Sequence, residues 1–218
     1  MFLTPSIPNP ADFLTFVYMQ GVPQLDLPAG SLAGASIDTS GNLTAISSSG
    51  TVSVGMVLYG TGSDPSPSLL TWNGTTLTGT ILPVPALAIS GLSLSVYMPW
   101  LLWAFDYATY RCIEGDGYIP PEAYTLAVYN LAMHQLLKIG LDQSSQTWFA
   151  NARTQFKLLS FTGGVISAAA DQNTSQAVAI PDLLKNLSLS NLDCLKTPWG
   201  REYLGYAMNF GPYIVGMS

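Results

Sequence analysis

The sequence predicts an α+β protein: a helical core of about four to five helices, a small inserted β-module and a short extended arm. Helix start and stop signals bracket segments near both ends of the chain. Between them, residues 27–82 are rich in Gly, Ser, Thr and β-branched residues, and residues 158–180 break helical periodicity. We therefore expect a helical domain of residues 1–26 and 83–218, interrupted by a β-module at 27–82.

The composition is unusually poor in charge. Charged residues make up 9% of the 218 residues, against about 25% in an ordinary soluble domain. The mean hydropathy of +0.31 points the same way. Three interpretations compete: a membrane protein, an aggregation-prone fragment, or a subunit whose surface is mostly covered by neighbours.

The few charges are unevenly placed along the chain. Residues 1–110 hold five acids and no Lys or Arg, whereas residues 111–218 hold eight acids and seven bases, giving the formal net charge of −6. So acidic a chain lacks the basic surface that grips phosphates, which argues against tight DNA binding. An acidic wall would repel DNA, and this suits a passage through which DNA slides.

A membrane-spanning segment is weighed at residues 81–105, which run 25 residues without a charge. Pro83, Pro85, Gly91 and Pro99 break this run, and no Lys or Arg flanks its N-terminal side. We expect a proline-rich buried connector leading into a core helix. The N-terminus has no basic region, so it does not resemble a secretory signal.

The first helix is predicted at residues 10–20. Asn9 can cap it, Pro10 suits its first position, and Asp12 places a negative charge in its first turn. Gly21 then ends it. Its core-facing residues are Phe13, Phe16 and Val17.

The β-module is predicted to hold four to six short strands, with alternating runs at 43–46, 51–58 and 69–72. The turn pairs between them are Ser40-Gly41, Ser49-Gly50 and Asn73-Gly74, and the last predicts a type I′ hairpin. A disordered linker is the alternative. Val52, Val54, Val57 and Leu58 weigh against that alternative because they supply apolar surface to bury.

Helices return at Pro99, where Trp100, Trp103, Tyr107 and Tyr110 recur at helical spacing. We interpret this stripe as core packing rather than a ligand-binding box. Further helices are expected from 121 to 138, from a cap at Ser144 or Ser145 through 156, and through Leu195 with a Ser190–Asp193 capping box. Thr197 caps the last helix, whose apolar face is Trp199, Tyr203, Tyr206, Ala207 and Phe210.

Residues 158–180 are predicted to form two short strands or extended arms around a loop. Such an arm can add to a neighbour's sheet, because backbone pairing requires no particular side chains. A turn of helix is expected at 181–187, and the uncharged end of the chain, 211–218, is too apolar for a comfortable solvated tail.

The residues nominate no catalytic, cofactor or metal site. His134 is the sole histidine and is interpreted as a packed helix residue rather than a metal ligand. Cys112 and Cys194 fit neither a metal spacing nor a disulfide framework, so both are expected as buried thiols. Glu114 and Asp116 lack the other ligands of a calcium loop. No phosphate-binding glycine loop and no nucleophile elbow is present, so an enzyme is the least supported class.

Three segments carry a family resemblance. The stretch KNLSLSNLDCLKTPWGREYL at 185–204 resembles the C-terminal part of head-to-tail adaptor (connector, or neck) proteins of tailed bacteriophages, whose last helix opens on a Thr-Pro-aromatic-Gly motif. NPADFLTFV at 9–17 and YTLAVYNLAMHQLLKIG at 124–140 are similar to that family's first and third helices. The β-module departs from the compact adaptor and resembles small modules of phage tail and fibre proteins.

The resemblance implies a structural, non-enzymatic virion protein, assembled in the host cytoplasm. It would form a homo-oligomeric ring, commonly of twelve copies, that docks under the portal protein and meets a tail terminator or other neck protein. DNA would pass through the lumen without sequence-specific binding. The implied interface residues are Tyr213, Ile214, Val215 and Met217 of the tail with Arg201 and Trp199, while Thr197, Pro198 and Gly200 would be structural.

The alternative function is a decoration or fibre-binding collar protein, whose β-module contacts other virion parts or the host surface. In either case we expect no cofactor, no metal and no membrane. The scarcity of charge would then reflect subunit contacts, since the cores of obligate interfaces exclude charges.

Overall fold

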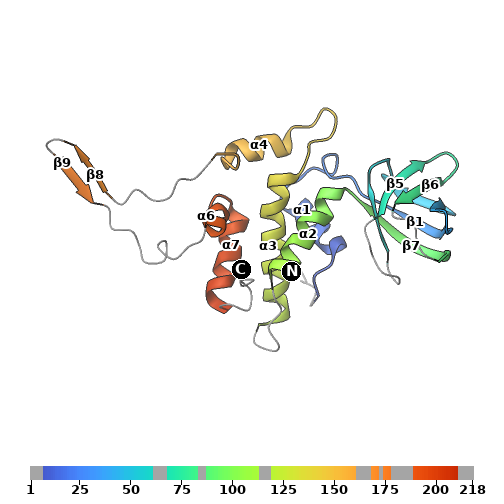
Figure 1. Ribbon diagram of the computed structural model, residues 1–218, viewed down its shortest axis with the longest axis horizontal. Helices are drawn as coiled ribbons and strands as arrows, with labels where there is room; N and C mark the ends of the chain where they lie inside the picture. Colours follow the sequence, from blue (N-terminus) through green and yellow to red (C-terminus); the bar gives the residue numbers. More distant parts are fainter. Residues whose placement is uncertain are drawn as a thin grey trace. The chain divides into compact units, whose positions relative to one another are not determined.

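A computed structural model describes residues 7–60, 68–82, 87–112, 119–160, 168–171, 174–177 and 189–210 (Figure 1). The chain divides into two compact units. The β unit comprises Pro10–Phe105 and Gly140–Phe149, and the helical unit comprises Met1–Asn9, Asp106–Ile139 and Ala150–Ser218. Each unit is described by itself below.

The β unit begins with helix α1 (Pro10–Met19), which confirms the first predicted helix. Phe13 and Val17 are fully buried, and Phe13 packs against Phe105 with ring centroids 5.9 Å apart. The helix ends in a Schellman motif, in which Gly21 N–H donates to the Tyr18 carbonyl and Val22 N–H to the Val17 carbonyl. Gly21 takes a φ of 92°, which explains why glycine stands there.

Seven antiparallel strands follow in one curled sheet. Their bounds are β1 Gly30–Ile37, β2 Asn42–Thr44, β3 Ser47–Gly50, β4 Val57–Gly60, β5 Ser68–Asn73, β6 Thr78–Leu82 and β7 Ile89–Tyr97. The order is β2-β6-β5-β4-β7-β1-β3, and an additional pairing of β2 with β1 curls the sheet back on itself. Figure 1 labels β1, β5, β6 and β7 of this sheet.

The sheet corrects the predicted fold class. A helical core with a small inserted β-module is wrong, because a curled seven-stranded sheet forms the core of its own unit. The decisive strand is β7, which lies beyond the expected module end at 82 and pairs with both β4 and β1. Leu94 and Val96 are buried in it, so residues 89–97 are a central strand and not a connector.

The turns explain two further differences. Asn73-Gly74 does lie in a β5–β6 hairpin, but Asn73 pairs with Thr78, so the loop has four residues instead of a type I′ pair. Leu77 takes the positive φ of 51° in this loop. Ser49-Gly50 was predicted as a turn and instead belongs to β3, which pairs with β1 from Ala33↔Ser47 to Gly30↔Gly50.

The helical unit is built around α3 (Pro121–Ile139), which confirms the helix predicted at 121–138. Most of its length is buried, including Tyr129, Met133 and Leu136. Helix α7 (Pro198–Phe210) packs against α3 and against the short α6 (Leu189–Cys194). Tyr203 and Ala207 of the predicted α7 face are buried, while Trp199, Tyr206 and Phe210 are half-buried.

Helices α2 (Pro99–Arg111) and α4 (Trp148–Gln155) each begin in the β unit and end in the helical unit. The cap of α4 is not the predicted one. The Asp142 carboxylate accepts the Phe149 N–H at 2.6 Å, and Ser145 takes a positive φ of 68° in the preceding turn. Among the described residues, no helix combines the length and the apolar composition that crossing a bilayer requires.

Strands β8 (Ala168–Asp171) and β9 (Thr174–Ala177) form a separate two-stranded antiparallel sheet, called the β8–β9 ribbon below. The expectation of two short strands within 158–180 is thereby confirmed. The expected helical turn at 181–187, the Glu114 and Asp116 turn and the tail at 211–218 lie outside the described residues.

Candidate functional site

His134 lies at the centre of a buried polar cluster in the helical unit. Its Nδ1 is 2.8 Å from the Thr197 hydroxyl, and its Nε2 is 3.5 Å from the Asp193 carboxylate. The carboxylate favours the tautomer with its proton on Nε2, so Nδ1 accepts a hydrogen bond from Thr197. In outline, this hydroxyl–imidazole–carboxylate arrangement resembles a nucleophilic triad.

The cluster nevertheless lacks what a triad needs. The Thr197 side chain is fully buried, and its oxygen already accepts the Gly200 N–H at 2.9 Å as the N-cap of α7. A nucleophile must reach a substrate, and this fully buried hydroxyl has no access to one. The prediction that His134 is a packed helix residue is confirmed, with 2% of its surface exposed.

Electrostatics support a structural role for the cluster. Burial, reinforced by Lys138, lowers the pKa of His134 to about 4, so the ring is neutral at pH 7. Asp193 binds Lys138 at 2.6 Å and Lys196 at 3.1 Å, and despite the opposing effect of burial its pKa is lowered by these lysines. Lys196 also donates to the Ser160 carbonyl at 2.8 Å. The cluster thus ties α3, α6 and the start of α7 together.

The two cysteines are buried and unpaired with each other, which confirms the expected thiols. Burial raises the pKa of Cys112 to about 12 and that of Cys194 to about 11, so neither is a nucleophile at neutral pH. Among the described residues, no group of three or more His, Cys, Asp or Glu side chains is placed to hold a metal ion.

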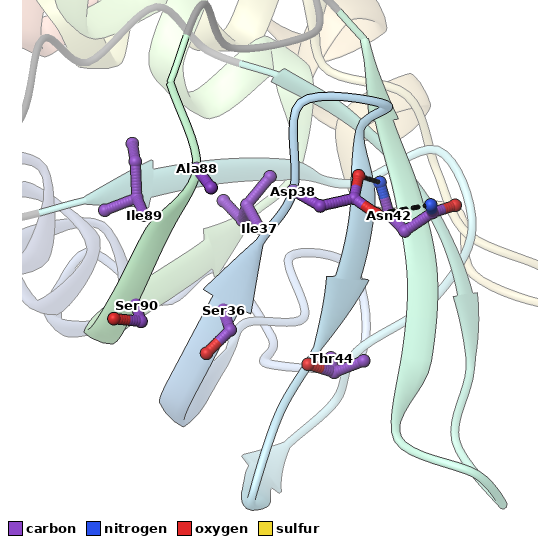
Figure 2. A pocket seen from close by; sticks show the side chains of 8 residues that line it. All are labelled: Ser36, Ile37, Asp38, Asn42, Thr44, Ala88, Ile89 and Ser90. Atoms are coloured by element: carbon purple, nitrogen blue, oxygen red, sulfur yellow. Dashed lines mark hydrogen bonds between the residues drawn. The ribbon is translucent and has the colours of Figure 1, made fainter.

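A hollow of about 300 Å³ with a mixed lining lies in the β unit where β1, β2 and β7 meet, and Ile37, Ala88 and Ile89 form its apolar part (Figure 2). Hydroxyl groups of Ser36, Thr44 and Ser90 line it, together with Asp38 and Asn42. The Asp38 carboxylate receives the Ser40 and Asn42 backbone N–H groups at 2.8 Å each and the Asn42 side-chain amide at 2.6 Å. These bonds lower the pKa of Asp38 and fix the β1–β2 turn.

The expectation that the aromatic stripe of α2 is core packing is wrong for three of its four residues; Trp100 is half-buried, with its indole nitrogen covered. Trp103, Tyr107 and Tyr110 are 58%, 37% and 86% exposed. Steps of four and three residues place them on one helix face. Arg111 lies over the Tyr107 ring, 6.0 Å from its centroid. We call Trp103, Tyr107 and Tyr110 the α2 stripe.

The structure describes some of the predicted interface residues and not others. Arg201 is exposed, and its guanidinium donates to the Leu195 carbonyl at 3.0 Å. Trp199 is half-buried against Phe156, with ring centroids 5.9 Å apart in an edge-to-face arrangement. Tyr213, Ile214, Val215 and Met217 lie outside the described residues.

Two features escaped sequence reasoning. Asp26 is fully buried, and neither of its carboxylate oxygens has a hydrogen-bond partner among the described atoms. Burial raises the pKa of Asp26, and the charge of Asp142 raises it further; the backbone N–H of Gln143, which lies near the carboxyl without the geometry of a full hydrogen bond, offsets part of this. The second feature is the cluster around Asp193. The sequence did offer a signal for it, because His134 and Lys138, and likewise Asp193 and Lys196, are spaced so that they lie on the same face of a helix.

Comparisons with protein-family models, with curated proteins and with solved structures each returned no match.

Proposed function

We propose that this protein is a structural virion subunit, forming a ring that connects the capsid portal to the tail and surrounds the DNA channel. The observation that carries the proposal is the exposed α2 stripe on a chain with only 9% charged residues. Large exposed apolar patches on soluble proteins mark interaction sites. The segment resemblances supply the adaptor class to which such a subunit would belong.

The energetic argument concerns the exposed surface of the α2 stripe. A large aromatic side chain buries about 150–250 Å² when covered, and burying an apolar side chain is worth about 1.5–3 kcal/mol. Trp103 and Tyr110 are mostly exposed, so covering them would recover roughly a few kcal/mol on association; Tyr107, which is 37% exposed, would add less. The Arg111 guanidinium over Tyr107 fits an interface as well, because Arg and aromatic residues are enriched there.

We propose further copies of this chain as the occupants. A ring requires heterologous contacts, in which one surface meets a different surface of the next copy. Exposed large apolar residues occur in both units: Ile46, Val54, Leu82 and Leu87 in the β unit, and Leu159 and Met208 in the helical unit. Two separate sets of apolar residues suit a contact of this kind better than they suit one localised patch for a single ligand.

The test is electron microscopy of the purified protein, followed by addition of portal rings. We expect closed rings with a central hole, commonly of twelve copies, that stack coaxially on the portal. A variant lacking residues 213–218 separates ring formation from docking: it should still form rings and lose portal binding. Dispersed monomers with and without portal would overturn the proposal.

A passage for DNA is supported by charge alone. All the charged residues of the β unit are aspartates, five in number, and the unit contains no Lys or Arg. We therefore expect no retention of duplex DNA by the assembled ring at low salt, where phosphate contacts are strongest. Tight binding would argue for a nucleic-acid-binding protein instead.

The second candidate is a decoration or fibre-binding collar protein, favoured by the hollow of the β unit. A hollow of about 300 Å³ whose lining combines three hydroxyls with apolar Ile37, Ala88 and Ile89 suits a ligand with hydroxyl groups and an apolar face, such as a glycan. Saturation-transfer NMR with a panel of oligosaccharides tests it, with Ser90→Ala and Thr44→Val as lining variants. Signals that persist in both variants, or that are absent from the wild type, would count against this candidate.

A further inference from the structure

We propose that the β8–β9 ribbon of one copy adds to the outer edge of β3 in a second copy, forming a continuous sheet across the subunit boundary. This inference rests on the proposed self-assembly and names the backbone contact that would join neighbouring copies. It concerns Ser47–Gly50 as acceptor and Ala168–Asp171 with Thr174–Ala177 as donor.

The acceptor is an open sheet edge. Strands β2 and β3 pair with β1 in one unchanged register, from Ile37↔Leu43 to Gly30↔Gly50. Strand β6 covers the other side of β2, with its last pair at Thr44↔Thr78, and Leu77 accepts the Ala45 N–H. No described strand pairs with the outer edge of β3 beyond that point.

The direction of the free backbone groups follows from the ladder. Thr51 N–H donates to the Ala29 carbonyl at 2.9 Å. Because hydrogen-bonded and non-hydrogen-bonded pairs alternate in an antiparallel ladder, Ser49, which pairs with Ser31, also turns its backbone groups towards β1. Ser48 therefore presents its N–H and C=O outward, to whatever lies beside β3.

Within the part of the chain that the structure describes, this edge carries none of the usual protection. Natural edge strands are guarded by Lys, Pro, inward-pointing charges or covering elements. β3 reads Ser-Ser-Ser-Gly, and all four residues are exposed. An open, uncharged edge of this kind is a template for strand addition, so we expect it to be covered in the assembled state.

Among the described residues, the donor ribbon lacks a third strand, just as β3 lacks a strand at its outer edge. A two-stranded ribbon alone is marginally stable in water, and three or more strands or packing on another element are needed. The ribbon sequences AAAD and TSQA contain no large apolar residue with which to form a core. Each strand has four residues, the length of β3, so one added contact would supply a third strand and close the open edge.

The matching needs of the two segments favour a second copy as the partner. The ribbon carries one charge, Asp171, and β3 carries none, so no like charges oppose the pairing of the two backbones. Each copy supplies one donor ribbon and one acceptor edge. The contact is also heterologous, as a closed ring requires.

Hydrogen–deuterium exchange of the assembled protein tests the proposal. Peptides covering 47–50 and 168–177 should both exchange more slowly in the ring than in the dissociated chain, by an order of magnitude or more. Ser48→Pro removes the outward N–H without removing a bond to β1. It should abolish the protection of both segments together, whereas Ser48→Ala, which keeps the N–H, should preserve it.

Three outcomes decide between the proposals. Rings whose 47–50 and 168–177 amides exchange as fast as in the dissociated chain would overturn strand addition and leave the proposed function standing. Protection of one segment without the other would also overturn it, since donor and acceptor must be covered together. A wild-type chain that remains monomeric would overturn both proposals.

Discussion

Thr197 and His134 are joined by a 2.8 Å hydrogen bond between the threonine hydroxyl and Nδ1, although they lie 63 residues apart in the sequence. The same hydroxyl oxygen accepts the Gly200 N–H and so caps the last helix. One side chain thus both starts α7 and attaches it to α3. The arrangement resembles a catalytic triad, but the hydroxyl is buried and caps a helix, so its role is structural.

Replacing Thr197 should therefore lower the free energy of unfolding by more than the loss of a helix cap alone. Thr197→Val keeps the volume and removes the hydroxyl, losing about 1 kcal/mol for the cap and about 1–3 kcal/mol for the buried His134 nitrogen left without a partner. Urea denaturation measures the loss. Thr197→Ser, which keeps the hydroxyl, is the matched control and should lie close to wild type; equal losses in the two variants would refute the hydrogen-bond account.

Gly200 and Gly205 give a second matched pair within α7. A Cβ at Gly200 would collide with the Cys194 carbonyl, whereas a Cβ at Gly205 would meet open space. Gly200→Ala should destabilise the protein, because α6 must move. Gly205→Ala should stabilise it by about 0.5–1 kcal/mol through helix propensity. Thermal unfolding followed by circular dichroism compares them, and shifts of the same sign would contradict the packing described.

The low pKa of His134 makes the helical unit sensitive to acid. Between its ordinary pKa of 6.5 and its folded value of about 4, the unfolded chain binds a proton that the folded chain does not. Stability should therefore fall as the pH is lowered through this window, by up to about 1.4 kcal/mol per pH unit. His134→Gln should flatten the profile between pH 6.5 and 4. A variant with the wild-type slope would show that His134 is not the responsible group.

Asp26 should make the stability of the protein depend on pH in the opposite direction. Its raised pKa means that the folded state holds a proton more tightly than the unfolded state, so its contribution favours folding at low pH and is lost as the pH rises. Asp26→Asn should raise the melting temperature at pH 7 and lose that advantage near pH 3.5. Asp38→Asn is the contrasting control, because the pKa of Asp38 is lowered and its ionised form is the one that the turn binds.

The helices could be predicted because their signals are local. Asn9-Pro10 and Thr197-Pro198 announce helix starts by side-chain chemistry that acts within one turn. The sheet depends on pairing between distant segments, so its size was misjudged. Leu92, Leu94 and Val96 alternate with Ser93 and Ser95 in a strand pattern, but the prolines that precede them favoured a connector.

The candidate site shows the same limit. Periodicity placed Trp103, Tyr107 and Tyr110 on one helix face correctly but could not say what covers that face. The burial of Asp26 was equally hidden, because its loop meets the 140–149 segment only in three dimensions. Caps and faces are encoded locally, whereas burial is decided by the whole fold.

Sedimentation of the wild type beside a Trp103→Glu, Tyr110→Glu variant tests most directly whether further copies cover the α2 stripe. We expect the wild type to sediment as a multiple of its 23.2 kDa chain mass and the variant as a monomer with an unchanged circular dichroism spectrum, because a carboxylate in a buried apolar contact is strongly unfavourable. A wild type that stays monomeric at high concentration, or a variant that assembles as the wild type does, would contradict the account.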